Sequence, residues 1–326
     1  MSFNRENFIK VKNEFEEKAN RAEELADARA RDAERAIPEL KAINAELATT
    51  GLQILTAIRE EPTKAKALLK EIEARNKALQ AEKRRLLAAN GFPEDYTEPK
   101  YECDDCSDTG YVNGKMCHCM REALILAGYD SSGIGKLLRT QNFDNFSLDY
   151  YKNNRQNYEI MSRALEIVKS YAENFDVKKP KNLLFIGGTG LGKTHLSSAV
   201  AKTVIDKGYD VMYKTAIGIM SDFEYSRFGN AAVTDDISPT SRYFDCDLLI
   251  IDDLGTEISN QFTVSTIYNI IDTRINTEKS MLISTNLSGD ELRKRYWDRI
   301  TSRLFGEFDI IPFAGIDVRA QKAKIK

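Results

Sequence analysis

The sequence predicts an α/β domain built on a parallel sheet, preceded by an α-helical hairpin and a small zinc-binding module. Three observations support this. Short apolar runs alternate with helix-compatible segments in the second half of the chain, a glycine-rich loop follows the first of these runs, and four of the five cysteines lie between Cys103 and Cys119. Strands of a parallel sheet are apolar throughout because helices cover both faces of the sheet.

Composition excludes several classes of protein. The 326 residues are 42% hydrophobic and 30% charged, which is typical of a folded globular chain. The 47 Lys and Arg residues against 50 Asp and Glu residues give a net charge of −3, so no global positive field attracts nucleic acid. No apolar run is long enough to span a membrane, and the N-terminus lacks the apolar segment of a signal peptide. We therefore expect a cytoplasmic protein with no membrane partner and only local contacts to DNA.

Amphipathic helices are predicted over the first 90 residues. Apolar residues recur at steps of three and four over Phe8–Leu47, and Pro38 should bend or break this helix because it cannot donate a backbone hydrogen bond. A second long helix is expected over Glu61–Ala89, with the helix-stop sequence Asn90-Gly91 beyond it. The two apolar stripes can pair as an antiparallel hairpin. A partner-binding arm and a helical spacer with solvated charged faces are both compatible with this pattern.

The cysteine spacing predicts a structural zinc site. Cys103 and Cys106 form one close pair, and Cys117 and Cys119 form another around His118, across a turn-rich segment. Two such pairs fit tetrahedral Zn²⁺, and metal binding supplies the folding free energy that a small module lacks. His118 in place of one of the last pair is an alternative, as is a reduced or redox-active group of thiols. No open coordination position is evident, so catalytic zinc is not expected.

Four parts follow from these patterns. Residues 1–92 are the expected helical partner-binding arm, residues 93–128 the zinc module, residues 129–153 a linker containing Gly, Ser and Asn, and residues 154–326 the α/β domain. Cys246, just before a predicted strand, is interpreted as a core thiol. The expected strands are Leu183–Ile186, Val211–Tyr213, Leu248–Ile251, Met281–Ser284 and Ile310–Phe313.

The segment Gly187–Thr194 has the GxxxxGK[ST] pattern of a phosphate-binding loop, with a predicted strand before it and a predicted helix after it. Glycines let the backbone N–H groups and the helix N-terminus face the phosphates. Lys193 is expected to reach the β- and γ-phosphate oxygens, and the Thr194 hydroxyl to ligate Mg²⁺. The expected nucleotide contacts are Gly187, Gly188, Thr189, Gly190, Leu191, Gly192, Lys193, Thr194 and His195.

Polar side chains end two further predicted strands. Asp252 and Asp253 follow Leu248–Ile251, and Asn286 follows Met281–Ser284. Ligands of α/β proteins bind at the carboxyl ends of the strands. We therefore expect Asp252 to hold Mg²⁺ directly or through water, and Asp253 to polarise the attacking water. Asn286 would lie between the end of Leu183–Ile186, where the phosphate loop begins, and the end of Leu248–Ile251, where the two aspartates lie. It would orient the attacking water.

The motifs GGTGLGKTHL, LLIIDDLGTE, STNL and DRITSRL, in this order, resemble the AAA+ ATPase module of bacterial replicative helicase loaders of the DnaC/DnaI type and of IstB transposition helpers. The resemblance covers about residues 140–326. It implies an AAA+ P-loop ATPase that uses ATP and Mg²⁺, associates with itself through the ATP site, and binds single-stranded DNA and the replicative helicase hexamer. Only 23 residues follow Arg303, too few for the C-terminal lid of the wider class.

The resemblance also assigns site residues. It makes Asn286 the sensor and Arg303 the arginine finger that completes the site of a neighbouring subunit, with Arg299 as a competing candidate. Solvated charges or structural ion pairs are the alternative for both arginines. Arg319 is a weaker candidate for sensing nucleotide. In this family a helix inserted before the acidic motif lines the DNA channel, and here it falls on Met220–Phe228, whose aromatic residues could equally be core.

Cysteine clusters precede the ATPase module in the loaders of low-GC Gram-positive bacteria, which this chain resembles in that respect. There the N-terminal region grips the helicase, so the resemblance implies an ATP-dependent helicase loader whose residues 1–128 bind the helicase. Two alternatives share the ATPase. One is an IstB-like transposition helper that binds duplex DNA, and the other is a phage or plasmid adaptor that captures the helicase with little hydrolysis.

Overall fold

The computed structural model describes residues 3–60, 65–228 and 240–325. The chain divides into two compact units, Lys12–Met120 on the one hand and Arg121–Lys326 with Met1–Val11 on the other. Each unit is described by itself. No helix among the described residues is both long enough and apolar enough to cross a membrane.

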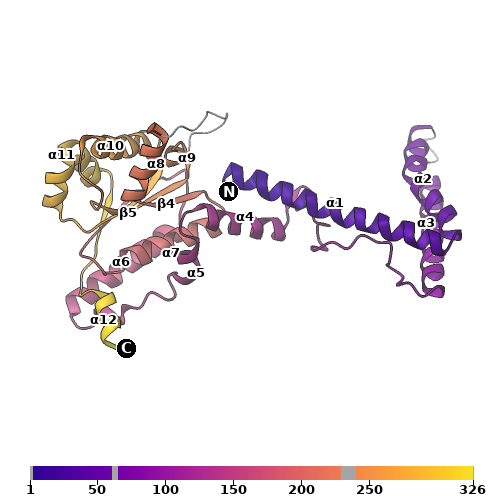
Figure 1. Cartoon of the computed structure of the whole chain (residues 1–326), viewed down its shortest axis with the longest axis horizontal. Coiled ribbons are helices and arrows are strands. Elements are labelled where there is room, and N and C mark those ends of the chain that lie inside the picture. The colour runs from indigo at the N-terminus through magenta and orange to yellow at the C-terminus, as the bar shows by residue number, and fades with distance from the viewer. Residues whose placement is uncertain (1–2, 61–64, 229–239, 326) are drawn as a thin grey trace. The chain divides into compact units, whose positions relative to one another are not determined.

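A five-stranded parallel sheet forms the centre of the larger unit (Figure 1). Its strand order is β4-β5-β6-β3-β7. All five predicted apolar runs lie in these strands, with ends that differ by three residues at most. The strands are β3 (Leu183–Ile186), β4 (Val211–Thr215), β5 (Leu248–Leu254), β6 (Ser280–Thr285) and β7 (Asp309–Pro312).

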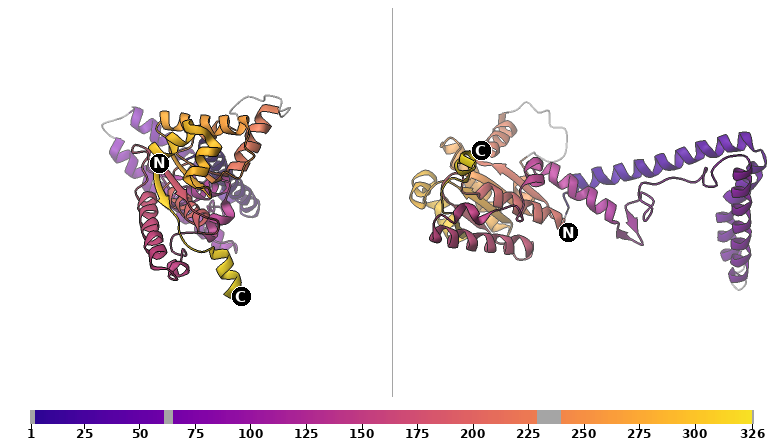
Figure 2. Two further views of the ribbon diagram at one scale, coloured as in Figure 1. Left: turned by 90° about the vertical axis from the view of Figure 1, so that its left-hand side faces the viewer. Right: turned by 90° about the horizontal axis from the view of Figure 1, so that it is seen from below.

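Helices cover both faces of this sheet (Figure 2). Successive side chains of a strand point to opposite faces, so Phe185 and Tyr213 pack with α6 and α7, whereas Leu184 and Met212 pack with α8 to α11. These two buried layers confirm the predicted α/β class. The helices of the unit are α4 (His118–Ser131), α5 (Gly135–Thr140), the 3-10 helix η1 (Leu148–Tyr151), α6 (Arg155–Glu173), α7 (Lys193–Asp206), α8 (Ala216–Phe228), α9 (Arg242–Asp245), α10 (Gln261–Asn276), α11 (Gly289–Gly306) and α12 (Val318–Ile325).

The smaller unit contains most of α1 (Arg5–Ala36), together with α2 (Glu39–Glu60), α3 (Ala65–Ala89), β1 (Tyr111–Val112) and β2 (Lys115–Met116). Helix α1 ends two residues before Pro38, as predicted. The expected start of the last helix falls partly on residues 61–64, which lie outside the described residues.

The helical hairpin differs from the prediction in which helices pair. Helices α2 and α3 lie side by side (Figure 2), and the Thr50 hydroxyl donates to Asn76 Oδ1 at 2.9 Å. Helix α2 is continuous from Glu39 to Glu60 and includes Gly51. Ala33, Ile37, Leu40 and Leu87 form the buried centre where the three helices meet.

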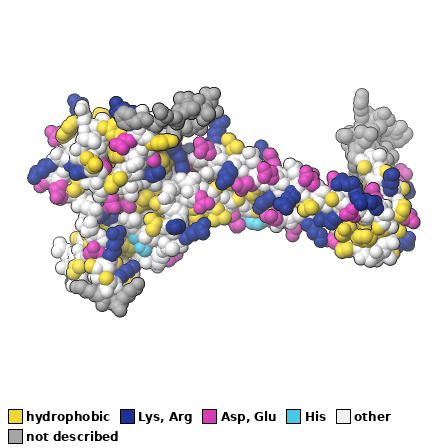
Figure 3. Space-filling view, in the orientation of Figure 1, with side chains coloured by type: hydrophobic (Ala, Val, Ile, Leu, Met, Phe, Trp, Pro, Cys, Tyr) yellow, Lys and Arg dark blue, Asp and Glu magenta, His cyan; other side chains and the backbone are white. Residues whose placement is uncertain are grey.

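Charged side chains of both signs are intermixed on the surface of α1 (Figure 3). Some pair along the helix, as Lys12 Nζ does with Glu16 Oε1 at 3.2 Å and Arg35 with Asp32 at 3.1 Å. Exposed pairs of this kind contribute less than about 1 kcal/mol each. The helix therefore depends mainly on its buried positions, among which are Val11, Phe15, Ala22 and Ala26.

Candidate functional site

The phosphate loop connects β3 to α7. Gly190 and Gly192 have φ of +70° and +89°, in the left-handed region that glycine adopts without strain. Gly192 is the N-cap of α7 and supplies no side-chain acceptor, so no side chain caps the first N–H groups of the helix. These groups and the positive end of the helix dipole are suited to an anionic ligand.

Lys193 lies inside the loop with 4% of its surface exposed. Its Nζ donates to Gly187 O at 2.6 Å, to Gly188 O at 2.7 Å and to Asn286 Oδ1 at 2.6 Å. Burial lowers the pKa of Lys193, and the negative charges of Asp253 and Asp252 oppose that shift. All three ammonium hydrogens thus have acceptors, which phosphate oxygens can replace.

Three hydroxyl groups surround the buried carboxylate of Asp252, which is 3% exposed. Thr194 Oγ1 and Tyr213 Oη both donate to its Oδ2, at 3.0 Å and 2.8 Å. Ser284 Oγ donates to Oδ1. The contact between Thr194 and Asp252 brings together the two side chains that the sequence predicted as magnesium ligands.

Asp253 adopts φ of +55°, and the β5–β6 ladder is irregular at this point. Its N–H donates to Ser284 Oγ at 3.0 Å, and Asn286 Nδ2 donates to its Oδ1 at 3.4 Å. Burial, with the neighbouring Asp252 as a second cause, raises the pKa of Asp253. A carboxylate made more basic in this way is better suited to accept a proton from water.

Asn286 lies between Lys193 and Asp253 because β6 is placed between β5 and β3 in the sheet. This position of Asn286 between the other two strand ends is the one predicted. The carboxyl ends of three neighbouring strands thus bring the phosphate loop, both aspartates and the asparagine to one edge of the sheet.

A cavity of about 250 Å³ opens at this edge. Phosphate-loop residues, Asp253 and Asn286 line one part of it, and Arg319 also faces it. Another part is lined by residues of the expected linker that sequence reasoning did not single out, among them Gln141, Asn145, Phe146, Tyr150 and Tyr151. Their aromatic content (NFDNFSLDYY) was the available signal.

Hydrogen bonds hold residues 142–151, which belong to the expected linker, against the phosphate loop and the helix that follows it. Tyr151 Oη donates to Leu191 O at 2.9 Å. His195 Nε2 lies 2.9 Å from Asn142 O and 2.9 Å from Asn145 Oδ1, and burial lowers the pKa of His195. His195 thus contacts the segment directly, in addition to lining the cavity.

The two candidate finger arginines lie on α11 after a break at Trp297, which has φ of +56°. Arg303 forms an ion pair with Asp272 of α10, and its guanidinium carbon lies 5.5 Å from the ring centre of Tyr268. Arg299 is exposed, and its side chain makes no hydrogen bond or ion pair with the residues that the structure describes. Neither arginine is among the described residues that line the cavity of its own chain.

Among the described side chains of Met220–Arg227, some are buried or half-buried and others are exposed. Phe223 packs on the core, 5.4 Å from the ring of Tyr243, whereas Tyr225 is 66% exposed. The guanidinium of Arg227 lies 5.7 Å from the ring centre of Phe262. The side chain of Phe228 lies outside the described part of the structure. Contact of this helix with DNA stays a prediction.

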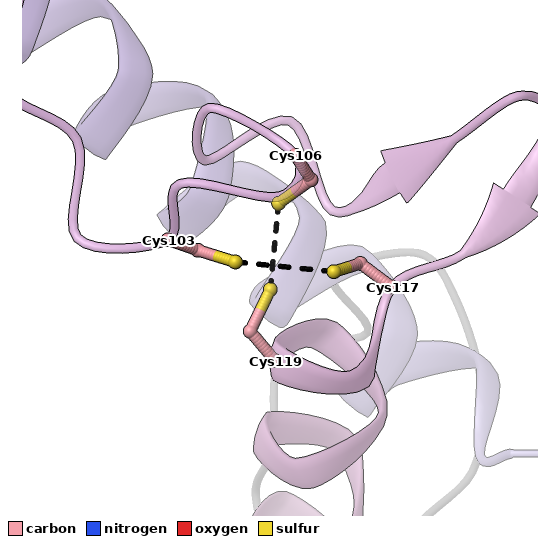
Figure 4. Close-up of side chains that lie close together, drawn as sticks. All are labelled: Cys103, Cys106, Cys117 and Cys119. Carbon is pink, nitrogen blue, oxygen red and sulfur yellow. Dashed lines mark hydrogen bonds between the residues drawn. The ribbon is translucent and has the colours of Figure 1, made fainter.

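The four clustered cysteines point their sulfurs at one another (Figure 4). Cys103 Sγ and Cys117 Sγ are 3.9 Å apart, Cys106 Sγ and Cys119 Sγ are 3.5 Å apart, and all four lie within 4.8 Å of one another. Ligands placed tetrahedrally at a Zn–S distance of about 2.3 Å are about 3.8 Å apart. The sulfur positions therefore fit one tetrahedral zinc ion.

Two tight turns lie between the cysteine pairs, one at Ser107 and Asp108 and one at Asn113 and Gly114, and all four residues have positive φ. The Asp108 carboxylate accepts hydrogen bonds from the N–H groups of Glu102 and Cys103, both at 2.8 Å. Burial raises the pKa of Cys119 and of Cys106, so a bound cation is needed to favour their thiolates. The exposed His118 lies beside the group, with Nδ1 3.5 Å from Cys117 Sγ.

Comparison with known proteins identifies the larger unit. Residues 147–308 match the family model of the IstB-like ATP binding protein. This part of the chain is an IstB-like ATP-binding domain. Its parallel sheet, with the phosphate loop between β3 and α7, has the strand–loop–helix arrangement of a P-loop nucleotide-binding domain.

The IstB-like domain is similar to replicative helicase loaders named DnaC. The chain is 28% identical over 173 residues to DnaC of Buchnera aphidicola subsp. Baizongia pistaciae, which covers 53% of this chain and 66% of that protein. It is 27% identical over 176 residues to DnaC of Escherichia coli K12, covering 54% and 67%. The similarity thus extends over about two thirds of these relatives and about half of this chain.

Two solved structures are also similar to the chain. A crystal structure of the DnaC helicase loader has 24% identity and a TM-score of 0.47, covering 55% of this chain and 99% of that one. A crystal structure of DnaI has 18% identity and a TM-score of 0.46, covering 56% and 92%.

Proposed function

We propose that this protein is an ATP-dependent loader of the replicative DNA helicase in DNA replication. The observation that carries the proposal is the IstB-like domain with similarity to DnaC, in which Lys193, Asp252 and Asn286 meet at the carboxyl ends of three neighbouring strands. The IstB-like transposition helper and the helicase-capturing adaptor share this ATPase and differ in partner or turnover.

The residues of the site support ATP binding and hydrolysis. Lys193 exchanges its three protein acceptors for phosphate oxygens, and the N–H groups at the start of α7 contact the same phosphates. Thr194 and Asp252 would hold Mg²⁺, which neutralises phosphate charge when it is bound. Asp253, made more basic by burial, accepts a proton from the attacking water, and Asn286 orients that water.

Replacing Lys193 with alanine is expected to weaken ATP binding about 100-fold, because hydrogen bonds from a charged donor contribute about 1.5–3 kcal/mol. Isothermal titration with ATP measures the change. Lys202→Ala is the matched control, since Lys202 lies on the same helix and pairs with Asp206 at 2.6 Å outside the cavity. Equal ATP affinity of the Lys193 variant and the wild type would contradict the phosphate-loop assignment.

The N-terminal arm is proposed to bind the helicase, with the zinc module as its structural support. Helix α1 carries an exposed apolar side chain, Leu25, which is 51% exposed among charged neighbours. Single-stranded DNA is the proposed ligand of the ATPase domains when several copies associate through the ATP site. Tyr225 is an exposed aromatic residue suited to stacking on a base.

Co-elution of the full chain with the replicative helicase tests the loader proposal. We expect a complex whose amount differs between ATP and ADP, and we expect Leu25→Asp to weaken it about tenfold, the effect of removing an interface anchor. Ile167→Asp is the control, because Ile167 is a 38% exposed apolar residue on a helix of the other unit. No complex with either nucleotide, together with tight binding to duplex DNA, would favour the transposition helper.

A further inference from the structure

Tyr213 contacts the acidic centre of the ATP site, although no sequence motif includes it. Its side chain is 2% exposed, and its hydroxyl donates to Asp252 Oδ2 at 2.8 Å. A tyrosine hydroxyl carries its proton at neutral pH, so Tyr213 is the donor in this contact and the Asp252 carboxylate the acceptor.

The fold fixes the position of this hydroxyl. Strand β4 is parallel to β5, with Tyr213 opposite Ile250 in the register, and both side chains belong to the buried layer beneath α7. On the other side of β4, the Tyr213 N–H donates to Ser132 O at 2.9 Å. A Cβ on Gly133 would come within 2.8 Å of Tyr213 O, so the backbone there is closely packed.

The hydrogen bond from Tyr213 is important for the orientation of Asp252, because the Oδ2 atom of Asp252 accepts from only two of the described side chains. Asp252 Oδ2 accepts from both Thr194 and Tyr213, whereas Oδ1 accepts from Ser284. A Mg²⁺ ion at the phosphate loop would be held by Thr194 and Asp252, so the orientation of the Asp252 carboxylate would affect how the ion binds. Without the Tyr213 hydroxyl, Thr194 would be the remaining side-chain donor to Oδ2 among the described residues.

We propose that Tyr213 is a positioning residue that orients Asp252 for magnesium-dependent ATP binding. The proposal rests on the proposed ATP-binding function and extends it to a residue outside the phosphate loop and acidic motif. Tyr213 does not line the cavity, and its hydroxyl is connected to the site through its hydrogen bond to the Asp252 carboxylate.

The test compares ATP affinity with Mg²⁺ and with EDTA in the full chain. Tyr213→Phe removes one hydroxyl and keeps the packed ring. We expect the ratio of the two affinities to fall about tenfold, the effect of one hydrogen bond to a charged group, with the affinity in EDTA unchanged. Tyr243→Phe is the matched control, because the buried Tyr243 hydroxyl also donates to a carboxylate, that of Asp222, which does not line the cavity.

The outcomes separate the two levels of the proposal. An unchanged ratio in Tyr213→Phe, or an equal fall in Tyr243→Phe, would overturn the role of Tyr213. A wild-type protein that binds no ATP would instead overturn the proposed function. Thermal melting of both variants is recorded, and binding is measured at 10 °C as well as 25 °C, so that a destabilised variant is compared while it is folded.

Discussion

Arg303→Ala is expected to slow ATP hydrolysis by the assembled protein about 1,000-fold while leaving ATP affinity unchanged. An arginine finger acts on the γ-phosphoryl group bound by a neighbouring subunit, where its charge stabilises the transition state. Consistent with action in trans, Arg303 does not line the cavity of its own chain. Hydrolysis is measured with single-stranded DNA at protein concentrations that support assembly, and ATP binding by titration.

The ion pair between Arg303 and Asp272 provides the control for this experiment. Asp272→Ala removes the same pair and leaves the guanidinium in place. If Arg303 only stabilises the fold through this ion pair, Asp272→Ala should slow ATP hydrolysis as much as Arg303→Ala does. If Arg303 is the arginine finger, Asp272→Ala should hydrolyse ATP at close to the wild-type rate. The pair is partly exposed, so its effect on stability is below about 1 kcal/mol. Loss of hydrolysis in Arg299→Ala but not in Arg303→Ala would move the assignment to Arg299.

Local sequence patterns predicted the parts of the fold that depend on short segments. The five apolar runs are strands because residues buried on both faces must be apolar throughout, as Leu248–Ile251 shows. Pro38 separates two helices because it lacks the N–H that the helix needs. The sequence also predicted that Lys193, Asp252 and Asn286 lie close together, because parallel strands bring their carboxyl ends to one edge of the sheet.

Contacts between distant segments were not predictable in the same way. Phe146 and Tyr151 line the cavity only because residues 141–151 fold back on the phosphate loop. Tyr213 reaches Asp252 because β4 is the neighbour of β5, and a single sequence does not state which strands pair. The pairing of α2 with α3 depends likewise on which apolar stripes meet, and amphipathic patterns leave this open.

Removing zinc is expected to unfold the turns between Cys103 and Cys117. All of residues 93–128 are described, and their buried hydrophobic side chains are Cys106 and Cys117 themselves with Met120 and Leu124 of α4. Burial of one apolar side chain contributes about 1.5–3 kcal/mol, whereas structural zinc contributes an apparent 10–16 kcal/mol at pH 7. Bonds from the four sulfurs to a zinc ion would thus contribute more to the stability of this module than its few buried side chains do.

Cys106→Ser tests this argument, with Cys246→Ser as the matched control. Both positions are buried, but Cys246 lies just before β5 and its thiol donates to Leu248 O at 3.5 Å, far along the chain from the cluster. We expect one zinc per chain by metal analysis in the wild type and in Cys246→Ser, and less than a tenth of this in Cys106→Ser, with rapid proteolysis near the cluster.

ATP affinity should persist in both variants, because the phosphate loop belongs to the other unit. Protease resistance of a metal-free cluster would show that hydrogen bonds such as those to Asp108 suffice to fold the turns.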